Sequence, residues 1–371
     1  MKPKESLRPL RNVINCLPWR LSAACGFYQG EGPPVRFVIE NANWAIRWVG
    51  EHICEAIESC DPGKIAVSTQ PERLTHRIVH FGSQYMWLDW GQHMSSSNRY
   101  IASFFHGKPE DGPDVERHID RFLDSTPRLE RIVTAASLVE QRLLNWGVPH
   151  SKIVRIPIGV DTSLFVPPTD LQRHRARQKF KIPDSAVVVG SFQKDGVGWG
   201  DGMMPKLIKG PDIYIKAMQM MKMSGLQVVG FLTGPARGYV KQGLSDIGIP
   251  FIHTYAKDHS DLLHFYHALD LYLVTSREEG GPMGLMESMA CGVPVVSTHV
   301  GMAPDLIIDG VTGRLANVDD AQQVASMALE LISMPHLHKL LRQARKAVMI
   351  ADWSVVGQSH WSQIYQPLLA V

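Results

Sequence analysis

The stretch of sequence that decides the fold is Ser276-Arg-Glu-Glu-Gly-Gly-Pro-Met-Gly-Leu-Met-Glu-Ser-Met-Ala-Cys-Gly-Val-Pro-Val-Val-Ser297. It follows a short apolar run and reads as a glycine-rich loop, a short helix and a second apolar strand. Gly280 and Gly281 let the loop backbone adopt conformations that are closed to other residues and approach a ligand closely. The helix after the loop presents free N–H groups and a partial positive charge at its first turn. The pattern therefore predicts an α/β protein with an anion site at this loop.

Two glutamates bracket the loop, Glu279 before it and Glu287 on the helix after it, with seven residues between them. A carboxylate accepts hydrogen bonds from neighbouring hydroxyl groups, as on a ribose or another sugar ring. In the predicted helix Leu285 and Met289 share a core-facing side, which turns Glu287 toward the polar side. The stretch is interpreted as a clasp for a sugar nucleotide; the alternative is a surface turn with two solvated glutamates.

Length and composition set the broader frame. At 371 residues, with 44% hydrophobic and 20% charged residues, the chain is expected to form two domains of a globular protein. The net charge of +2 gives no reason to expect a nucleic-acid partner. The five cysteines contain no CxxC pair, so a disulfide framework is not expected. No apolar run reaches the roughly 18 residues that a spanning helix needs.

Short apolar runs alternate with helical patterns along the chain, which predicts βαβ units and parallel sheets. Two successive series of this kind predict two doubly wound, Rossmann-like domains facing a central cleft. The expected domains are an N-terminal extension over residues 1–30, an acceptor domain over 31–168, a nucleotide-sugar domain over 169–351 and a C-terminal helix over 352–371 that returns to the N-terminal domain. The extension is interpreted as an ordered segment or as one that touches a membrane.

The glutamate stretch resembles the signature of retaining GT-B glycosyltransferases of the family 4 type, the glycosyl transferases group 1. Supporting segments are Val133-Thr-Ala-Ala-Ser137, Lys152 to Asp161, Lys209-Gly-Pro211, His299-Val-Gly301 and Asp309-Gly-Val-Thr-Gly313. The resemblance implies transfer of a sugar from a nucleotide-diphosphate donor to a glycan or lipid-linked acceptor with retention of configuration. It also implies a cytoplasmic enzyme, with a peripheral position at the inner membrane face as one setting.

By that resemblance, Glu279 lies against the donor sugar near the reacting carbon and Glu287 holds the ribose hydroxyls. Backbone N–H groups of Met283 and Gly284 meet the sugar and the diphosphate, and Gly281 belongs to the same donor-binding loop. The chain departs from the commoner Glu-Gly-Phe-Gly form because Pro282, which has no N–H, stands in the loop. Any donor contact that relatives make through that N–H is therefore lost.

Positive charge is needed opposite the diphosphate, because the leaving group becomes more negative in the transition state. Lys209 matches the family lysine that precedes the glycine at the start of a helix. The family's second basic residue has no direct counterpart, since Ser191 and Phe192 stand near its place. Lys206 is the favoured substitute, and Lys194 is the alternative.

In the N-terminal half, His106 follows an apolar strand, where relatives carry a histidine that points at the sugar hydroxyls. His106 is therefore expected to join Glu279 in the catalytic group. The first strand-to-helix loop carries Asn41 and Asn43 where relatives usually have paired glycines, so the family's acceptor contact is not carried over.

No two aspartates are separated by a single residue, so the metal-binding Asp-x-Asp pair of the other common sugar-nucleotide fold is missing. No cofactor and no metal are therefore expected, apart from the sugar nucleotide as co-substrate. Two alternatives remain: a sugar-nucleotide epimerase of the same architecture, and a non-catalytic GT-B-like binding protein. An NAD-dependent dehydrogenase is disfavoured because no Gly-x-Gly-x-x-Gly follows the first strand.

Overall fold

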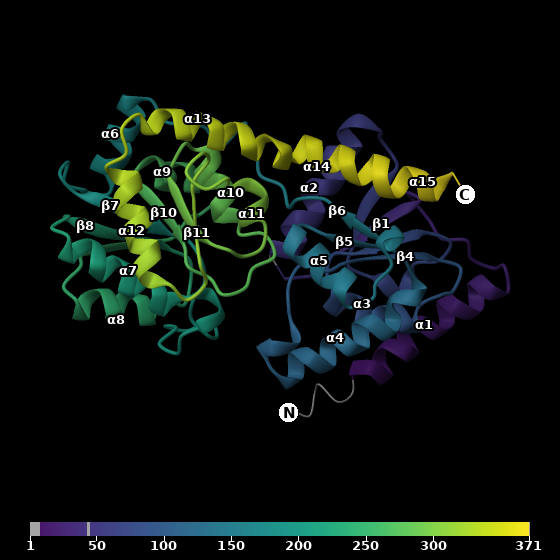
Figure 1. Ribbon diagram of the computed structural model, residues 1–371. Coiled ribbons are helices and arrows are strands. Elements are labelled where there is room, and N and C mark those ends of the chain that lie inside the picture. The colour runs from purple at the N-terminus through teal and green to yellow at the C-terminus, as the bar shows by residue number, and fades with distance from the viewer. Residues whose placement is uncertain (1–7, 43–44, 371) are drawn as a thin grey trace. The chain divides into compact units, whose positions relative to one another are not determined.

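The computed structural model describes residues 8–42 and 45–370, with the side chains of residues 8–10 left aside. The chain divides into two compact units (Figure 1). The first comprises the described residues up to Gly159 and takes in the chain again from Trp353, and the second is Val160–Asp352. Each unit contains one six-stranded parallel sheet with helices against it. The α/β class and the two Rossmann-like sheets predicted from the sequence are confirmed.

The sheet of the first unit has the strand order β2-β1-β3-β4-β5-β6, and every neighbouring pair is parallel. Its strands are β1 (Val35–Val38), β2 (Ile65–Ser68), β3 (Ile78–Phe81), β4 (Arg99–Ser103), β5 (Leu129–Thr134) and β6 (Ile153–Arg155). The helices are α1 (Arg8–Ala24), α2 (Ala45–Cys60), α3 (Gln84–Trp90), α4 (Pro113–Ser125), α5 (Ser137–Asn145), α14 (Trp353–His360) and α15 (Gln366–Leu369).

The C-terminal helical segment completes the core of the first unit. Helix α14 lies against α2, and a π-helical turn (Trp361–Tyr365) connects it to α15 (Figure 1). Phe37 and Ile53 share one apolar cluster with Trp353 and Ile364, which come from the far end of the sequence. Alternate strand residues point to opposite faces of a sheet. This cluster therefore covers the face toward which Phe37 points and leaves its neighbour Arg36 on the other face.

The sheet of the second unit has the order β12-β11-β10-β7-β8-β9, again parallel throughout. Its strands are β7 (Val187–Ser191), β8 (Val228–Thr233), β9 (Phe251–Thr254), β10 (Leu271–Val274), β11 (Val295–Thr298) and β12 (Arg314–Ala316). The order reverses between β7 and β10, which lie side by side at the centre. In open sheets of this type, ligands bind outside the carboxyl ends of the strands at this reversal.

Helices cover both faces of the second sheet. They are α6 (Asp170–Lys179), α7 (Pro211–Met223), α8 (Gly238–Asp246), α9 (Leu262–His267), α10 (Met283–Ala290), α11 (Ala303–Leu306), α12 (Ala321–Ile332) and α13 (Leu337–Val348). Leu271 and Leu273 of β10 join a core cluster with residues of α7, α8 and α12. Tyr272, between them, points to the opposite face, where its hydroxyl lies beneath Gly284 of α10.

The alternation of strands and helices predicted for both halves of the chain agrees with these elements. The loop expected at Asn41 to Ala45 is described only in part, because Asn43 and Trp44 lie outside the described residues, as do residues 1–7. Within the N-terminal extension the sequence left the structure open, and residues 8–24 form helix α1.

Candidate active site

Two loops meet at the reversal point of the second sheet, one after β7 and one after β10. The first ends in a short 3-10 turn, η6 (Leu207–Lys209), and the second carries Glu279. The ammonium group of Lys209 lies 2.6 Å from Oε2 of Glu279, and both side chains are largely buried. The structure thus brings together two residues that the sequence singled out separately, although seventy positions separate them.

Neighbouring polar groups hold this pair in place. The hydroxyl of Ser276 donates a hydrogen bond of 2.8 Å to Oε1 of Glu279. The side-chain amide of Gln193 donates to the carbonyl oxygen of Lys209 at 2.8 Å. Each oxygen of the Glu279 carboxylate therefore has its own partner, which fixes the orientation of the carboxylate before any ligand arrives.

Arg277 ties the two loops together from the side. Its guanidinium forms a bidentate ion pair with Asp212 at the start of α7, at 2.8 and 2.9 Å. Its Nε lies 2.6 Å from Asp319, and its backbone N–H donates to the carbonyl of Ile208 at 2.8 Å. Fork-like pairing of this kind adds geometric specificity to the charge attraction. Arg277 consequently fixes the turn that carries Lys209 relative to the loop that carries Glu279.

Lys206 stands at the start of the same turn, where its backbone N–H donates to the carbonyl of Asp195 at 2.7 Å. The pKa of Lys206 is lowered, first by the protein that surrounds its ammonium group and then by the positive charge of Lys209, while Glu279 opposes the shift. Lys194, the other candidate, places its ammonium 3.7 Å from the centre of the Trp199 ring. Lys206 is therefore close enough to Lys209 and Glu279 for their charges to act on it, and the charge of Lys194 lowers its pKa as well.

The glycine-rich loop leads directly into α10, whose N-cap is Pro282, with no side chain capping the helix among the described residues. A β-carbon at Gly284 would lie 2.0 Å from the hydroxyl of Tyr272, so only glycine lets the first turn sit this close to the sheet. Gly301 makes a second close approach, because a β-carbon there would come within 2.9 Å of the Glu279 carbonyl oxygen. Gly281 and Met283 are half-buried in the same loop.

The surroundings of Glu287 differ from those that the sequence predicted. Its side chain is buried, as is that of Ser288, so α10 has no polar side at these positions. The Tyr266 hydroxyl donates to Oε2 of Glu287 at 2.6 Å, and Nε2 of His259 lies 3.0 Å from Oε1. The expectation of a solvent-facing polar side was wrong because α9 and the turn before it cover this part of the helix. The carboxylate retains lone pairs for further hydrogen bonds.

His106 belongs to the first unit. It follows β4, is exposed to solvent, and its carbonyl oxygen accepts a hydrogen bond of 3.2 Å from the Gln84 side chain. The prediction that it lies just beyond the carboxyl end of a strand agrees with this position. Among the other histidines, His118 stacks against Tyr85, and a ring nitrogen of His253 lies 2.9 Å from the carbonyl oxygen of Gly234.

The sequence reasoning missed a buried ion pair beside the site. Arg237, from the loop after β8, places Nε 2.9 Å from Oδ1 of Asp195, and both side chains are almost fully buried. Arg237 also donates to the carbonyl oxygens of Ser191 and Thr233. Its guanidinium thus occupies the end of β7, the place where the sequence lacked a basic residue. The only sequence feature that could have indicated this ion pair is a basic residue shortly after β8, the strand next to β7.

The loop between Asp195 and Lys206 closes over this pair. Val197 donates its N–H to the carbonyl of Met204, and Gly196 pairs with Pro205. Gly202 takes a positive φ of 72° and would carry a β-carbon only 2.3 Å from the backbone of Ala236. This loop therefore packs closely against the residues that precede α8.

Two further observations concern the described part of the chain. Within residues 8–42 and 45–370, no three histidine, cysteine, aspartate or glutamate side chains are arranged to hold a metal ion. Over the same residues, none of the helices has the length and apolarity required to cross a membrane.

Comparison with known proteins connects this site to a family. Residues 206–348 match the family described as Glycosyl transferases group 1. A GDP-mannose-dependent alpha-(1-6)-phosphatidylinositol monomannoside mannosyltransferase of Mycolicibacterium smegmatis is 26% identical over 218 residues, which are 55% of this chain and 53% of that protein. A D-inositol 3-phosphate glycosyltransferase of Acidothermus cellulolyticus is 26% identical over 76% of this chain and 62% of its own length. The matched part of this chain thus spans about half to three-fifths of these relatives.

Solved structures support the fold. Anabaena Alr3699/HepE in complex with UDP superposes with a TM-score of 0.72 at 17% identity, over 91% of this chain and all of that one. Sucrose-phosphate synthase from Thermosynechococcus elongatus gives a TM-score of 0.71, also at 17% identity, over 91% and 99% of the two chains. At this level of identity the likeness concerns the fold alone, which is the GT-B architecture predicted from the sequence.

Proposed function

We propose that this protein, whose residues 206–348 match the glycosyl transferases group 1, transfers a sugar from a nucleotide-diphosphate donor to a glycan or lipid-linked acceptor. The observation that carries the proposal is the Lys209–Glu279 pair at the reversal point of the second sheet. A lysine suits the diphosphate and a carboxylate suits the sugar hydroxyls, so the pair has the chemistry for both ends of such a donor.

The donor pose follows from the charges at the site. The diphosphate lies at Lys206, Lys209 and the free N–H groups of Met283 and Gly284, where the helix N-terminus favours negative charge. Glu279 then exchanges its contact with Lys209 for the sugar hydroxyls, and Glu287 accepts from the ribose. As the bond from the sugar carbon to the phosphate oxygen breaks, negative charge grows on the diphosphate, and the two lysines stabilise it.

We extend the proposal to the stereochemistry by resemblance to the family. The acceptor hydroxyl attacks from the face that the nucleotide leaves, so that the configuration is retained. In this reaction the lysines take the place that a metal ion occupies in other sugar-nucleotide enzymes. The absence of an Asp-x-Asp pair from the sequence supports a metal-independent reaction.

The acceptor class is proposed from two sources. The Mycolicibacterium relative is named for a phosphatidylinositol mannoside, and one surface of this chain suits a lipid membrane. On α1, Ile14, Leu17 and Leu21 are exposed and follow one another at helical spacing, while Cys16 is buried. The helix contains arginines and no acidic residue. An apolar row flanked by positive charge favours contact with anionic lipids. Binding of the protein to anionic vesicles, and loss of this binding in Leu17→Asp, would support a lipid-linked acceptor.

The experiment that tests the function is a thermal-shift screen with UDP-, GDP-, ADP- and dTDP-sugars, followed by turnover of the donor that binds. A ligand that binds the folded state raises its stability by about 2.7 kcal/mol at one hundred times its Kd. We expect one nucleotide class to raise Tm and to release nucleoside diphosphate only when an acceptor is present.

The same screen separates the two alternatives. Conversion of the bound sugar nucleotide without any acceptor would identify an epimerase. Binding without transfer or hydrolysis on any acceptor would identify a non-catalytic binding protein. No stabilisation by any of the four nucleotide classes would contradict the proposal itself.

A further inference from the structure

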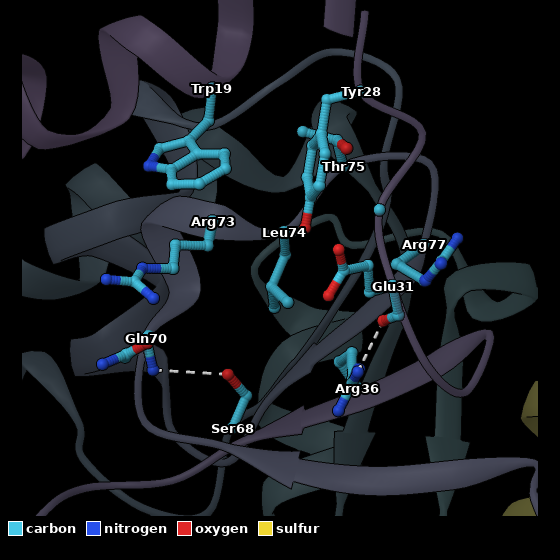
Figure 2. Close-up of a pocket in the computed structure, with 11 residues that line it drawn as sticks. Trp19, Tyr28, Glu31, Arg36, Ser68, Gln70, Arg73, Leu74, Thr75 and Arg77 are labelled. Carbon is cyan, nitrogen blue, oxygen red and sulfur yellow. Dashed lines mark hydrogen bonds between the residues drawn. The ribbon is translucent and has the colours of Figure 1, made fainter. Parts of the chain in front are cut away.

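The first unit contains a cavity of about 320 Å³ whose lining residues are not part of the candidate active site described above (Figure 2). Helix α1 and the segment after it form one wall, and the strands β1 and β2 with the turn after β2 form the others. Three arginines line the cavity, namely Arg36 of β1, Arg73 of the turn and Arg77 just before β3. Arg36 lies on the face of the sheet opposite the Phe37 core, so its guanidinium points into this space.

The three guanidinium groups have no carboxylate partner within the described residues. Arg36 donates to the carbonyl oxygen of Glu31 at 2.6 Å, and Arg77 donates to the carbonyls of Gln29 and His76. Arg73 lies over the Trp19 ring at 5.7 Å. Burial and the nearby charge of Arg77 lower the pKa of Arg36. A guanidinium stays charged in proteins, so these side chains leave a concentration of positive charge.

The contrast with other arginines of the protein makes this arrangement informative. Arg173 and Arg177 share the carboxylate of Asp270 at 2.5 and 2.9 Å, and Arg237 and Arg277 each have an aspartate partner. Glu31 also lines the cavity, and its carboxylate points into it in Figure 2, but no ion pair joins it to any of the three arginines within the described residues. One carboxylate also leaves two of the three positive charges uncompensated.

Buried polar atoms add a second observation. Nε of Arg36, Nε of Arg77 and the hydroxyl of Thr75 are buried without a hydrogen-bond partner. Thr75 is fully buried and lines the cavity. Unsatisfied buried donors are costly and call for a partner. On the other side of the space, Trp19 and Tyr28 offer aromatic surfaces with ring centres 5.1 Å apart, which suits a carbon skeleton (Figure 2).

We propose that this cavity is a binding site for a phosphomonoester, with the phosphate at Arg36 and Arg77 and the organic part against Trp19, Tyr28 and Arg73. Arginine is the side chain best suited to phosphate, because its planar donors match the phosphate oxygens. The phosphate can come from a soluble sugar phosphate or from a lipid headgroup. The proposal stands on the first unit alone and does not depend on the transferase reaction.

The test is isothermal titration of the full chain with glucose 6-phosphate, with glucose as the uncharged control. We expect saturable binding of glucose 6-phosphate only, and an increase in Kd of about tenfold or more in Arg73→Gln and Arg77→Gln. Arg117→Gln is the matched control, because Arg117 is an exposed arginine of the same unit that pairs with Asp114. Lys209→Gln removes anion binding at the donor site and should leave this affinity unchanged.

A parallel arm uses phosphatidylcholine vesicles with phosphatidic acid or, at equal charge, phosphatidylglycerol, which has no phosphomonoester. Binding that requires phosphatidic acid and is lost in Arg73→Gln supports a lipid-borne phosphate, and binding of glucose 6-phosphate supports a soluble one. Arg73 is exposed and forms no ion pair within the described residues, so this variant is expected to keep the wild-type Tm. Failure of both probes to bind, or binding lost in Lys209→Gln and kept in both arginine variants, would overturn the proposal.

Discussion

A β-carbon at Gly210 would lie 1.7 Å from the carbonyl oxygen of Thr275. The two residues also share a hydrogen bond, because the Thr275 hydroxyl donates to the Gly210 carbonyl at 2.8 Å. Gly210 follows Lys209 and Thr275 follows β10, so this contact joins the lysine turn to the glutamate loop by their backbones. The Lys209–Glu279 pair therefore depends on the close approach of Gly210 to Thr275.

Gly210→Ala is expected to destabilise the second unit by about 3 kcal/mol or more, because strain and a backbone clash add at this position. Gly210 has a φ of 60°, and the clash is with backbone atoms that cannot rotate away. Gly225→Ala is the control, since Gly225 also has a positive φ and nothing lies within 4 Å of its added carbon. Urea unfolding measures both, and equal losses would show that the contact with Thr275 costs nothing.

Donor affinity should fall at alkaline pH because of Lys206. Its pKa is lowered by burial and by Lys209, so the positive charge is complete at low pH and is lost as pH rises through a value below that of an ordinary lysine. Lys206→Arg keeps its charge to higher pH. Titration of the bound nucleoside diphosphate across pH should show the alkaline loss of affinity moving upward in this variant, and superimposable profiles would remove Lys206 from the site.

The Tyr266 hydroxyl is expected to stabilise the fold through Glu287. Tyr266→Phe leaves a buried carboxylate oxygen without its 2.6 Å donor, which costs about 1–3 kcal/mol. In the Glu287→Gln background the same change should cost less, because an uncharged amide is less expensive to leave unpaired. Tyr255→Phe, at an exposed tyrosine, is the control for losing a hydroxyl. A loss that is the same in both backgrounds would show that the two residues are not coupled.

The second unit shows which structural features could be predicted from the sequence and which could not. Apolar runs that alternate with helical patterns predicted the two parallel sheets, because local composition determines strands and helices. The sequence predicted that Lys209 and Glu279 belong to one site, but it did not predict that their side chains form an ion pair. The burial of Glu287 under His259 and Tyr266, and the position of Arg237 at the end of β7, depend on packing between segments that no local pattern relates.

Helix α1 shows the same limit at the other end of the chain. Pro18 lies inside it and its apolar residues are distributed around both buried and exposed sides. Neither a regular periodicity nor a cap was therefore available to predict it. The arginine cavity behind it was equally hidden, since Arg36 and Arg77 are distant in sequence and become neighbours only through the pairing of β1 with β3.

Stability should fall with acid because of two buried histidines, His80 of β3 and His360 at the end of α14. Burial lowers the pKa of His360 to about 4 and also holds the pKa of His80 well below its ordinary value. The folded state keeps both neutral, while the unfolded chain takes up protons below about pH 6.5. The contribution is complete above pH 6.5, and His360 alone accounts for a loss of about 3 kcal/mol as pH falls toward 4.

His360→Gln removes this proton uptake and can still donate to the carbonyl of Val356, which His360 contacts at 2.9 Å. Its unfolding free energy should therefore depend less steeply on pH between about 6.5 and 4. His150→Gln, at an exposed position of the same unit, serves as the matched control. An unchanged slope in His360→Gln would exclude His360 as the source of acid sensitivity.

The central claim is that Lys209 and Glu279 act on one sugar nucleotide. The most direct test is the steady-state turnover of the donor selected by the thermal-shift screen, measured for Lys209→Ala and Glu279→Gln, with the exposed Lys216→Ala of α7 as the control. The account predicts that kcat falls about a hundredfold or more in each of the two site variants and stays at the wild-type value in the control. A kcat near wild type in either Lys209→Ala or Glu279→Gln would contradict it.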